Sequence, residues 1–100
     1  MDKAEEILVT PKKLRQKAIE WNHLLKKAYD AYERVEKIVL GTDDCFAGRT
    51  AEQWKAQMRQ KKLEGQEQLV QMRGLPIKLF EIAKEYETAE RENQNAANRN

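Results

Sequence analysis

The fold is decided by a six-residue stretch near the middle of the chain, Asp43-Asp44-Cys45-Phe46-Ala47-Gly48. One long helical pattern leads up to this stretch and another leads away from it. Glycine tolerates the positive φ values that other residues avoid, so Gly48 is suited to a tight link. The stretch therefore predicts a turn that folds two long helices back on each other.

The helix before the turn is expected over residues 11–40. Thr10 is a favoured N-cap, and Pro11 at the first helical position loses no hydrogen bond. Gly41 is expected to end the helix as a C-terminal cap. The apolar residues recur at the spacing of a heptad seam: Leu14, Ala18, Trp21, Leu25, Ala28, Tyr32, Val35 and Val39. Others widen the stripe on one flank: Ile19, Leu24, Ala31 and Ile38.

The turn is expected over residues 41–49 and the second helix over residues 50–90. Thr50 and Gln53 match a capping box, in which each side chain bonds the backbone N–H of the other residue. The middle of the second seam is weak, because its heptad positions are polar: Lys61, Gly65 and Gln68. Apolar neighbours with a shifted phase are candidates to bury it: Leu63, Leu69 and Val70.

Gly74-Leu75-Pro76 interrupts the second helical pattern. A proline inside a helix removes a hydrogen bond and clashes with the preceding turn, at a cost of about 3 kcal/mol. Either a kink or a break with a restart near Leu75 is expected, and we favour the kink because the apolar positions keep their phase. Residues 92–100 are rich in asparagine and are expected to form a disordered tail, which leaves residues 1–91 as the hairpin domain.

The apolar stripe is wider than one neighbouring helix can cover. Charged residues make up 36% of the chain and the mean hydropathy is −0.93, typical of helical chains that complete their core with another chain. We expect an all-α fold, an antiparallel helical hairpin that dimerises into a four-helix bundle. The predicted partner interface consists of Leu14, Trp21, Leu25, Tyr32, Val35, Trp54, Met58 and Leu79.

The charge pattern argues against nucleic acid as a partner, and the lack of a long apolar run argues against stable membrane insertion. The 19 basic and 17 acidic residues are interspersed and give a net charge of +2, so there is no basic block. No apolar run is long enough to span a bilayer, and none follows the N-terminus as in a cleaved signal peptide. We expect synthesis in the cytoplasm and no stable membrane insertion.

Residue types that carry catalysis are sparse. His23 is the only histidine and Cys45 the only cysteine. There is no glycine-rich phosphate loop, no Glu-X-X-His pair and no Ser/His/Asp arrangement. Asp43 and Asp44 are expected to cap and solvate the turn, where their charge also favours the start of the second helix. We therefore expect no enzymatic activity, no metal and no cofactor.

The layout resembles the WXG family of small type VII secretion substrates, also called early-secreted-antigen-like proteins. The resemblance covers residues 11–90. Phe46-Ala47-Gly48 takes the place of the family's Trp-X-Gly turn, with phenylalanine where the family has tryptophan. Tyr86-Glu87-Thr88-Ala89-Glu90 is similar to the family's Tyr-X-X-X-Asp/Glu export signal.

The resemblance implies secretion without a cleaved signal peptide, as a substrate or as an adaptor for one. The implied partner is a second copy, a related hairpin protein or the N-terminal helical stalk of a type VII toxin, together with the secretion ATPase. Phe46 and Gly48 would form the turn motif, and Tyr86 and Glu90 the export motif. In the implied dimer the turn motif of one chain lies near the export motif of its partner, and together they form one recognition surface. Phe46 either plugs the open end of the hairpin or contacts the exporter. The alternative function is a structural coiled-coil module unrelated to secretion.

Overall fold

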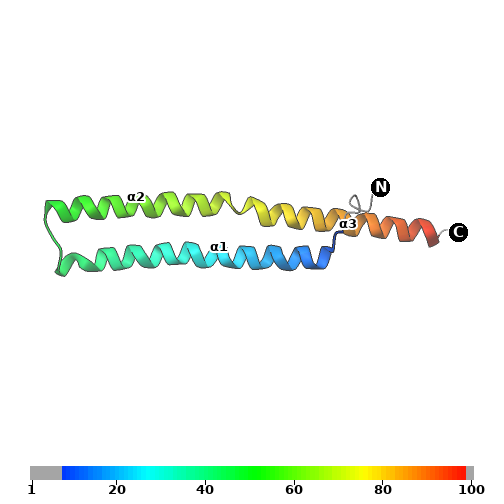
Figure 1. Cartoon of the computed structure of the whole chain (residues 1–100), viewed down its shortest axis with the longest axis horizontal. Helices are drawn as coiled ribbons and strands as arrows, with labels where there is room; N and C mark the ends of the chain where they lie inside the picture. Colours follow the sequence, from blue (N-terminus) through cyan, green and yellow to red (C-terminus); the bar gives the residue numbers. More distant parts are fainter. Residues whose placement is uncertain (1–7, 99–100) are drawn as a thin grey trace. The chain divides into compact units, whose positions relative to one another are not determined.

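The computed structural model describes residues 8–98, which contain helices and turns and no strand (Figure 1). The helices are α1 (Pro11–Leu40), the 3-10 helix η2 (Gly41–Asp44), α2 (Arg49–Gln71) and α3 (Gly74–Asn98). They form two compact units, which we describe separately. The turn unit (His23–Arg73) contains the second part of α1, η2 and α2. The terminal unit (Met1–Asn22 with Gly74–Asn100) contains the start of α1 and α3.

The predicted all-α helical hairpin is confirmed in the turn unit, where a short turn joins α1 to the antiparallel helix α2. The first helix has the predicted bounds, and its first turn is closed by a bond of 3.0 Å from the Leu14 N–H to the Thr10 carbonyl. Ala18, Leu25 and Val39 are buried, as the heptad seam predicts. Val35 departs from the seam and is 50% exposed.

Gly41 does not cap α1 as predicted, because the chain continues directly into η2. Among the described residues, only Gly48 has a positive φ. The end of α1 is closed by Thr42 instead: its hydroxyl donates to the Val39 carbonyl at 2.7 Å. The Thr42 carbonyl in turn accepts the Phe46 N–H at 2.7 Å. The first bond satisfies a carbonyl at the end of α1, and the second continues the chain into the turn.

Helix α2 begins at Arg49, one residue earlier than predicted. Its N-cap is Gly48, with φ of 111° and ψ of −178°, and no side chain caps it. The predicted capping box of Thr50 and Gln53 is therefore wrong, since both residues lie inside the helix. The positive φ of Gly48 lets the helix begin at the next residue, Arg49. Thr50 is therefore already helical and cannot take the non-helical conformation of an N-cap residue.

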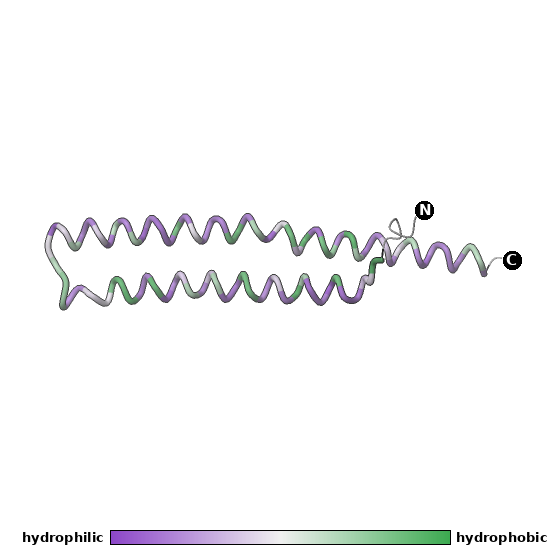
Figure 2. Tube along the Cα trace, viewed as in Figure 1, coloured by the Kyte–Doolittle hydropathy of each residue, from purple (hydrophilic) through white to green (hydrophobic). Residues whose placement is uncertain are grey.

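The interior between α1 and α2 is also different from the prediction. Gly65 and Gln66 are buried, whereas Leu63 and Val70 are 50% and 51% exposed. The predicted phase shift is therefore wrong for these leucine and valine side chains. Polar residues occupy α2 along most of its length, as the hydropathy colouring in Figure 2 shows. Close packing at Gly65 brings this polar face against α1.

The second predicted helix is two helices. Met72 and Arg73 form a turn between α2 and α3, so the interruption near Pro76 is a break and not the favoured kink. In a continuous helix the Pro76 ring would meet the carbonyl of Met72, four residues earlier. With the restart at Gly74, Pro76 lies in the first turn, where an N–H has no helical partner, and its side chain is fully buried.

The predicted disordered tail is wrong for residues 92–98, which continue α3 with every side chain exposed. Adding residues to an existing helix costs much less than starting one, so this extension does not need an apolar face. Residues 99–100 of the predicted tail, and residues 1–7 of the predicted hairpin domain, lie outside the described residues.

Candidate functional site

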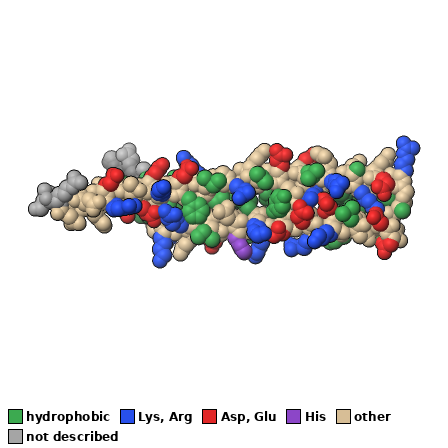
Figure 3. Space-filling model, turned by 180° about the vertical axis from the view of Figure 1, so that it is seen from behind, with side chains coloured by type: hydrophobic (Ala, Val, Ile, Leu, Met, Phe, Trp, Pro, Cys, Tyr) green, Lys and Arg blue, Asp and Glu red, His purple; other side chains and the backbone are tan. Residues whose placement is uncertain are grey.

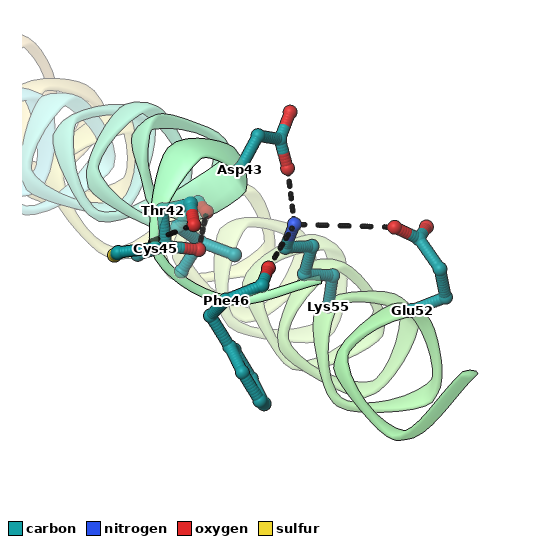
Figure 4. A network of polar contacts seen from close by, with 7 residues as sticks. Thr42, Asp43, Cys45, Phe46, Glu52 and Lys55 are labelled. Carbon is teal, nitrogen blue, oxygen red and sulfur yellow. Dashed lines mark hydrogen bonds and ion pairs between the residues drawn. The ribbon is translucent and has the colours of Figure 1, made fainter. Parts of the chain in front are cut away.

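The turn between α1 and α2 is held by a lysine that the sequence patterns did not single out. The Lys55 ammonium group on α2 contacts the Asp43 carboxylate, the Phe46 carbonyl at 3.3 Å and the Glu52 carboxylate at 3.9 Å (Figure 4). The Lys55 side chain is only 9% exposed. One cation therefore joins η2, the turn motif and the first turns of α2.

The charge of Lys55 is stabilised by this arrangement. The hydrogen bond to Asp43 raises the pKa of Lys55 above its ordinary value, and this effect exceeds the opposing effect of burial. A buried ammonium group needs such partners, because an unpaired charge in this position would be costly. Asp43 thus pairs with Lys55, and the predicted capping role is wrong, because no side chain caps η2 or α2.

Phe46 packs within the turn and is also partly presented to solvent. Its ring lies edge-on to Trp54, with 5.7 Å between ring centroids and 64° between ring planes. The Phe46 side chain is 39% exposed. The ring therefore packs on α2 through Trp54 and leaves a surface that a partner can contact. Gly48 needs glycine for its backbone conformation and not for space, since no described atom lies within 4 Å of the position that a Cβ would take.

A polar seam lies between α1 and α2, deeper in the turn unit. The Lys62 ammonium group lies 3.1 Å from a Glu33 oxygen and 2.8 Å from a Glu36 oxygen. The Gln66 amide donates to the Glu33 carboxylate at 2.8 Å and to the Tyr29 carbonyl at 3.4 Å. In this seam α2 supplies the donors and α1 supplies the acceptors. Apolar spacing does not reveal this seam. The signal in the sequence is that polar donor residues of α2 can pair with acidic residues of α1.

The polar seam shifts ionisation in the direction that favours charge pairing. Hydrogen bonds from Gln66 and then Lys62 lower the pKa of Glu33. Hydrogen bonds to Glu36 and Glu33 raise the pKa of Lys62. Glu36 turns inward to Lys62, whereas its neighbour Val35, a predicted seam residue, is half exposed.

In the terminal unit, Arg15 of α1 binds Glu87 of α3. Arg15 Nε donates to one carboxylate oxygen of Glu87 at 3.3 Å, and Nη2 donates to the other at 2.5 Å. The guanidinium carbon lies 6.0 Å from the centre of the Phe80 ring. The hydrogen bond from Arg15 lowers the pKa of Glu87. Glu87 lies inside the predicted export motif, so the middle of that motif is engaged within the chain. Tyr86, 37% exposed, and the exposed Glu90 are one helical turn apart on α3.

Most of the predicted partner interface packs inside the chain. Leu25 is buried, which excludes it from a surface contact, and five others are half-buried: Leu14, Trp21, Trp54, Met58 and Leu79. Tyr32 and Val35 are exposed. The indole N–H of Trp21 is buried and has no hydrogen-bond partner among the described residues.

The turn unit exposes a different apolar set, which we call the apolar flank: Leu24, Val35, Ile38, Leu63 and Val70. The three α1 members share one helix face, and the two α2 members are seven residues apart. A groove of about 380 Å³ runs between the helices, with Val35 and Leu63 both in its lining. On the face shown in Figure 3, hydrophobic side chains lie in patches between charged ones.

Among residues 8–98, no group of three or more His, Cys, Asp or Glu side chains is arranged to hold a metal ion. Cys45 is exposed, and its thiol donates to the Thr42 carbonyl at 3.4 Å. No helix in this part of the chain has the length and apolar character needed to cross a bilayer. Comparisons with family models, curated proteins and solved structures found no match.

Proposed function

We propose that this chain is a type VII secretion substrate, or an adaptor that pairs with one, and that it acts by binding and not by catalysis. The observation that carries the proposal is the turn motif: Phe46-Ala47-Gly48 joins two antiparallel helices, with Gly48 at positive φ and Phe46 partly exposed. Tyr86 and Glu90 lie on the exposed side of α3 and support an export signal at that helix. The secretion ATPase would be the receptor for these two motifs.

The apolar flank supports the pairing that this function requires. Ile38 and Leu24 are 70% and 60% exposed, and an exposed apolar surface of this kind favours association. The flank lies on both helices of the turn unit, so a partner hairpin can contact both. The candidate partners are a second copy, a related hairpin protein or the helical stalk of a secreted toxin.

Export of the full chain from a host that carries a type VII system tests this function. Tyr86→Ala and Glu90→Ala are expected to abolish appearance of the protein in the culture medium while cellular levels and helicity stay unchanged. Glu85→Ala is the matched control, because it removes an exposed carboxylate from the same helix outside the motif. Normal export of both motif variants would remove the export-signal hypothesis, and failure of the unmodified chain to be exported would remove the secretion proposal.

A structural coiled-coil module is the second candidate, and the apolar flank supports it equally well. This function predicts self-association or pairing without any export. Sedimentation of the purified chain together with the export assay separates the two: association with no export of the unmodified chain would favour the structural module.

A further inference from the structure

One turn of α2 makes two of the contacts that fix Phe46 in the turn motif. Phe46 has three groups that fix its position, and each has a partner in the structure. Its N–H donates to the Thr42 carbonyl at 2.7 Å, its carbonyl accepts from Lys55 at 3.3 Å, and its ring packs on Trp54. Trp54 and Lys55 are consecutive residues, so one turn of α2 holds both the ring and the backbone of Phe46.

Lys55 differs from the other buried lysine of the turn unit in what it binds. Lys62 joins α2 to carboxylates on α1 and, within residues 8–98, makes no ion pair with a residue of the turn. The contacts of Lys55 are to η2, to the backbone of the turn motif and to its own helix. The two lysines have similar burial, at 9% and 11% exposed, so their burial does not account for this difference.

We propose that Lys55 is a positioning residue for the turn motif, which holds the Phe46 backbone so that the exposed part of the ring is presented in one orientation. This inference rests on the proposed recognition of the turn by a partner. A group that is ordered before binding loses less conformational freedom in the complex. Without the Lys55 ammonium, the Phe46 carbonyl loses its side-chain donor, and Asp43 loses the cation that draws η2 towards α2.

The test compares Lys55→Met with Lys62→Met in a Trp21→Phe background, where Trp54 is the only tryptophan. Methionine keeps an unbranched apolar stem like that of lysine and lacks the ammonium group, so both variants can fill most of their buried sites. Acrylamide quenching of Trp54 fluorescence reports whether Phe46 still covers the indole, and the melting temperature reports overall stability. We expect a raised quenching constant for Lys55→Met only, and restoration by Lys55→Arg. Equal quenching in the two methionine variants would overturn the positioning role.

Export of Lys55→Met and Lys62→Met, made in the unmodified chain, separates this inference from the proposed function. Freeing one backbone residue that a receptor must reorder is expected to lower export by about fivefold to thirtyfold in Lys55→Met. Lys62→Met is expected to be exported like its parent. If the unmodified chain shows no export, the proposed function is wrong, and the fluorescence comparison still decides the role of Lys55. If Lys55→Met raises quenching but keeps full export, positioning has no role in recognition and the inference is overturned.

Discussion

Gly65→Ala tests the close packing of α2 against α1, because Tyr32 occupies the space in front of this glycine. A Cβ at Gly65 would overlap the Tyr32 ring, with the Cε1 atom at 2.6 Å and the end of the ring closer still. The ring has to swing outward to accommodate it. Loss of the buried part of a large aromatic side chain costs about 2 kcal/mol. Alanine offsets about 1 kcal/mol of this cost through its higher helix propensity.

The expected net effect is a loss of about 1 kcal/mol in the free energy of unfolding, or a fall of about 4–8 °C in melting temperature. In a Tyr32→Ala background the ring is absent, and the same Gly65→Ala change is expected to stabilise the protein by about 1 kcal/mol. The sign of the effect therefore reverses with the residue at position 32. The interaction energy between the two sites is about 2 kcal/mol, within the range that contacting residues show.

Urea unfolding of the four proteins, followed by circular dichroism at 222 nm, measures this interaction as a double-mutant cycle. The slope of the free energy with urea is expected to stay constant, so that the midpoints report stability. If Gly65→Ala stabilises the chain by the same amount in both backgrounds, the Tyr32 ring does not pack on Gly65 and the described register of the turn unit is wrong.

Three further predictions concern the turn, acid stability and association. Gly48→Ala is expected to lower stability by about 1–2 kcal/mol, because alanine is strained at positive φ. Gly41→Ala is expected to be near neutral, because Gly41 has an ordinary φ and open space around it. Thermal melts of the two variants check this difference. Glu33 and Glu87 have lowered pKa values in the folded chain, so their ionised carboxylates stabilise it above pH 4.5, the ordinary pKa, and this stabilisation is lost as the pH falls through the folded pKa values. Glu33→Gln is therefore expected to flatten the dependence of stability on pH in acid. An unchanged dependence would contradict the polar seam. Ile38→Asp is expected to weaken association in sedimentation experiments while the monomer keeps its helicity, with Lys37→Asp, an exposed charge change beside it, as the control.

The sequence predicts the first helix well because its signals are local and redundant. Thr10 and Pro11 mark its start, and the regular apolar spacing correctly identifies Ala18, Leu25 and Val39 as buried residues. The position of the turn is equally local, since it depends on the conformational freedom of Gly48. These features need no knowledge of the opposing helix.

The second half was harder to predict because its interior depends on pairing across the turn unit. Apolar periodicity cannot identify Lys55, Lys62 or Gln66 as interior residues, since each is buried only because α1 or the turn supplies an acceptor. At Thr50, a valid capping pattern was overridden by the glycine two residues earlier. At Pro76, the sequence offered a kink or a break, and the choice depended on where the next helix restarts.

In the turn unit, polar residues join α1 to α2, whereas the residues of the apolar flank are exposed. This division affects how the chain can pair with a partner. If α1 and α2 were joined by an apolar seam, a partner helix could compete for the same residues, because hydrophobic contacts are not directional. The polar seam is different, since the Lys62 and Gln66 donors require acceptors at the positions that Glu33, Glu36 and the Tyr29 carbonyl provide. A partner that lacks those acceptors would leave buried charges unpaired, which is costly. The seam thus favours the intramolecular hairpin and leaves the apolar flank for association, which supports the proposed pairing function.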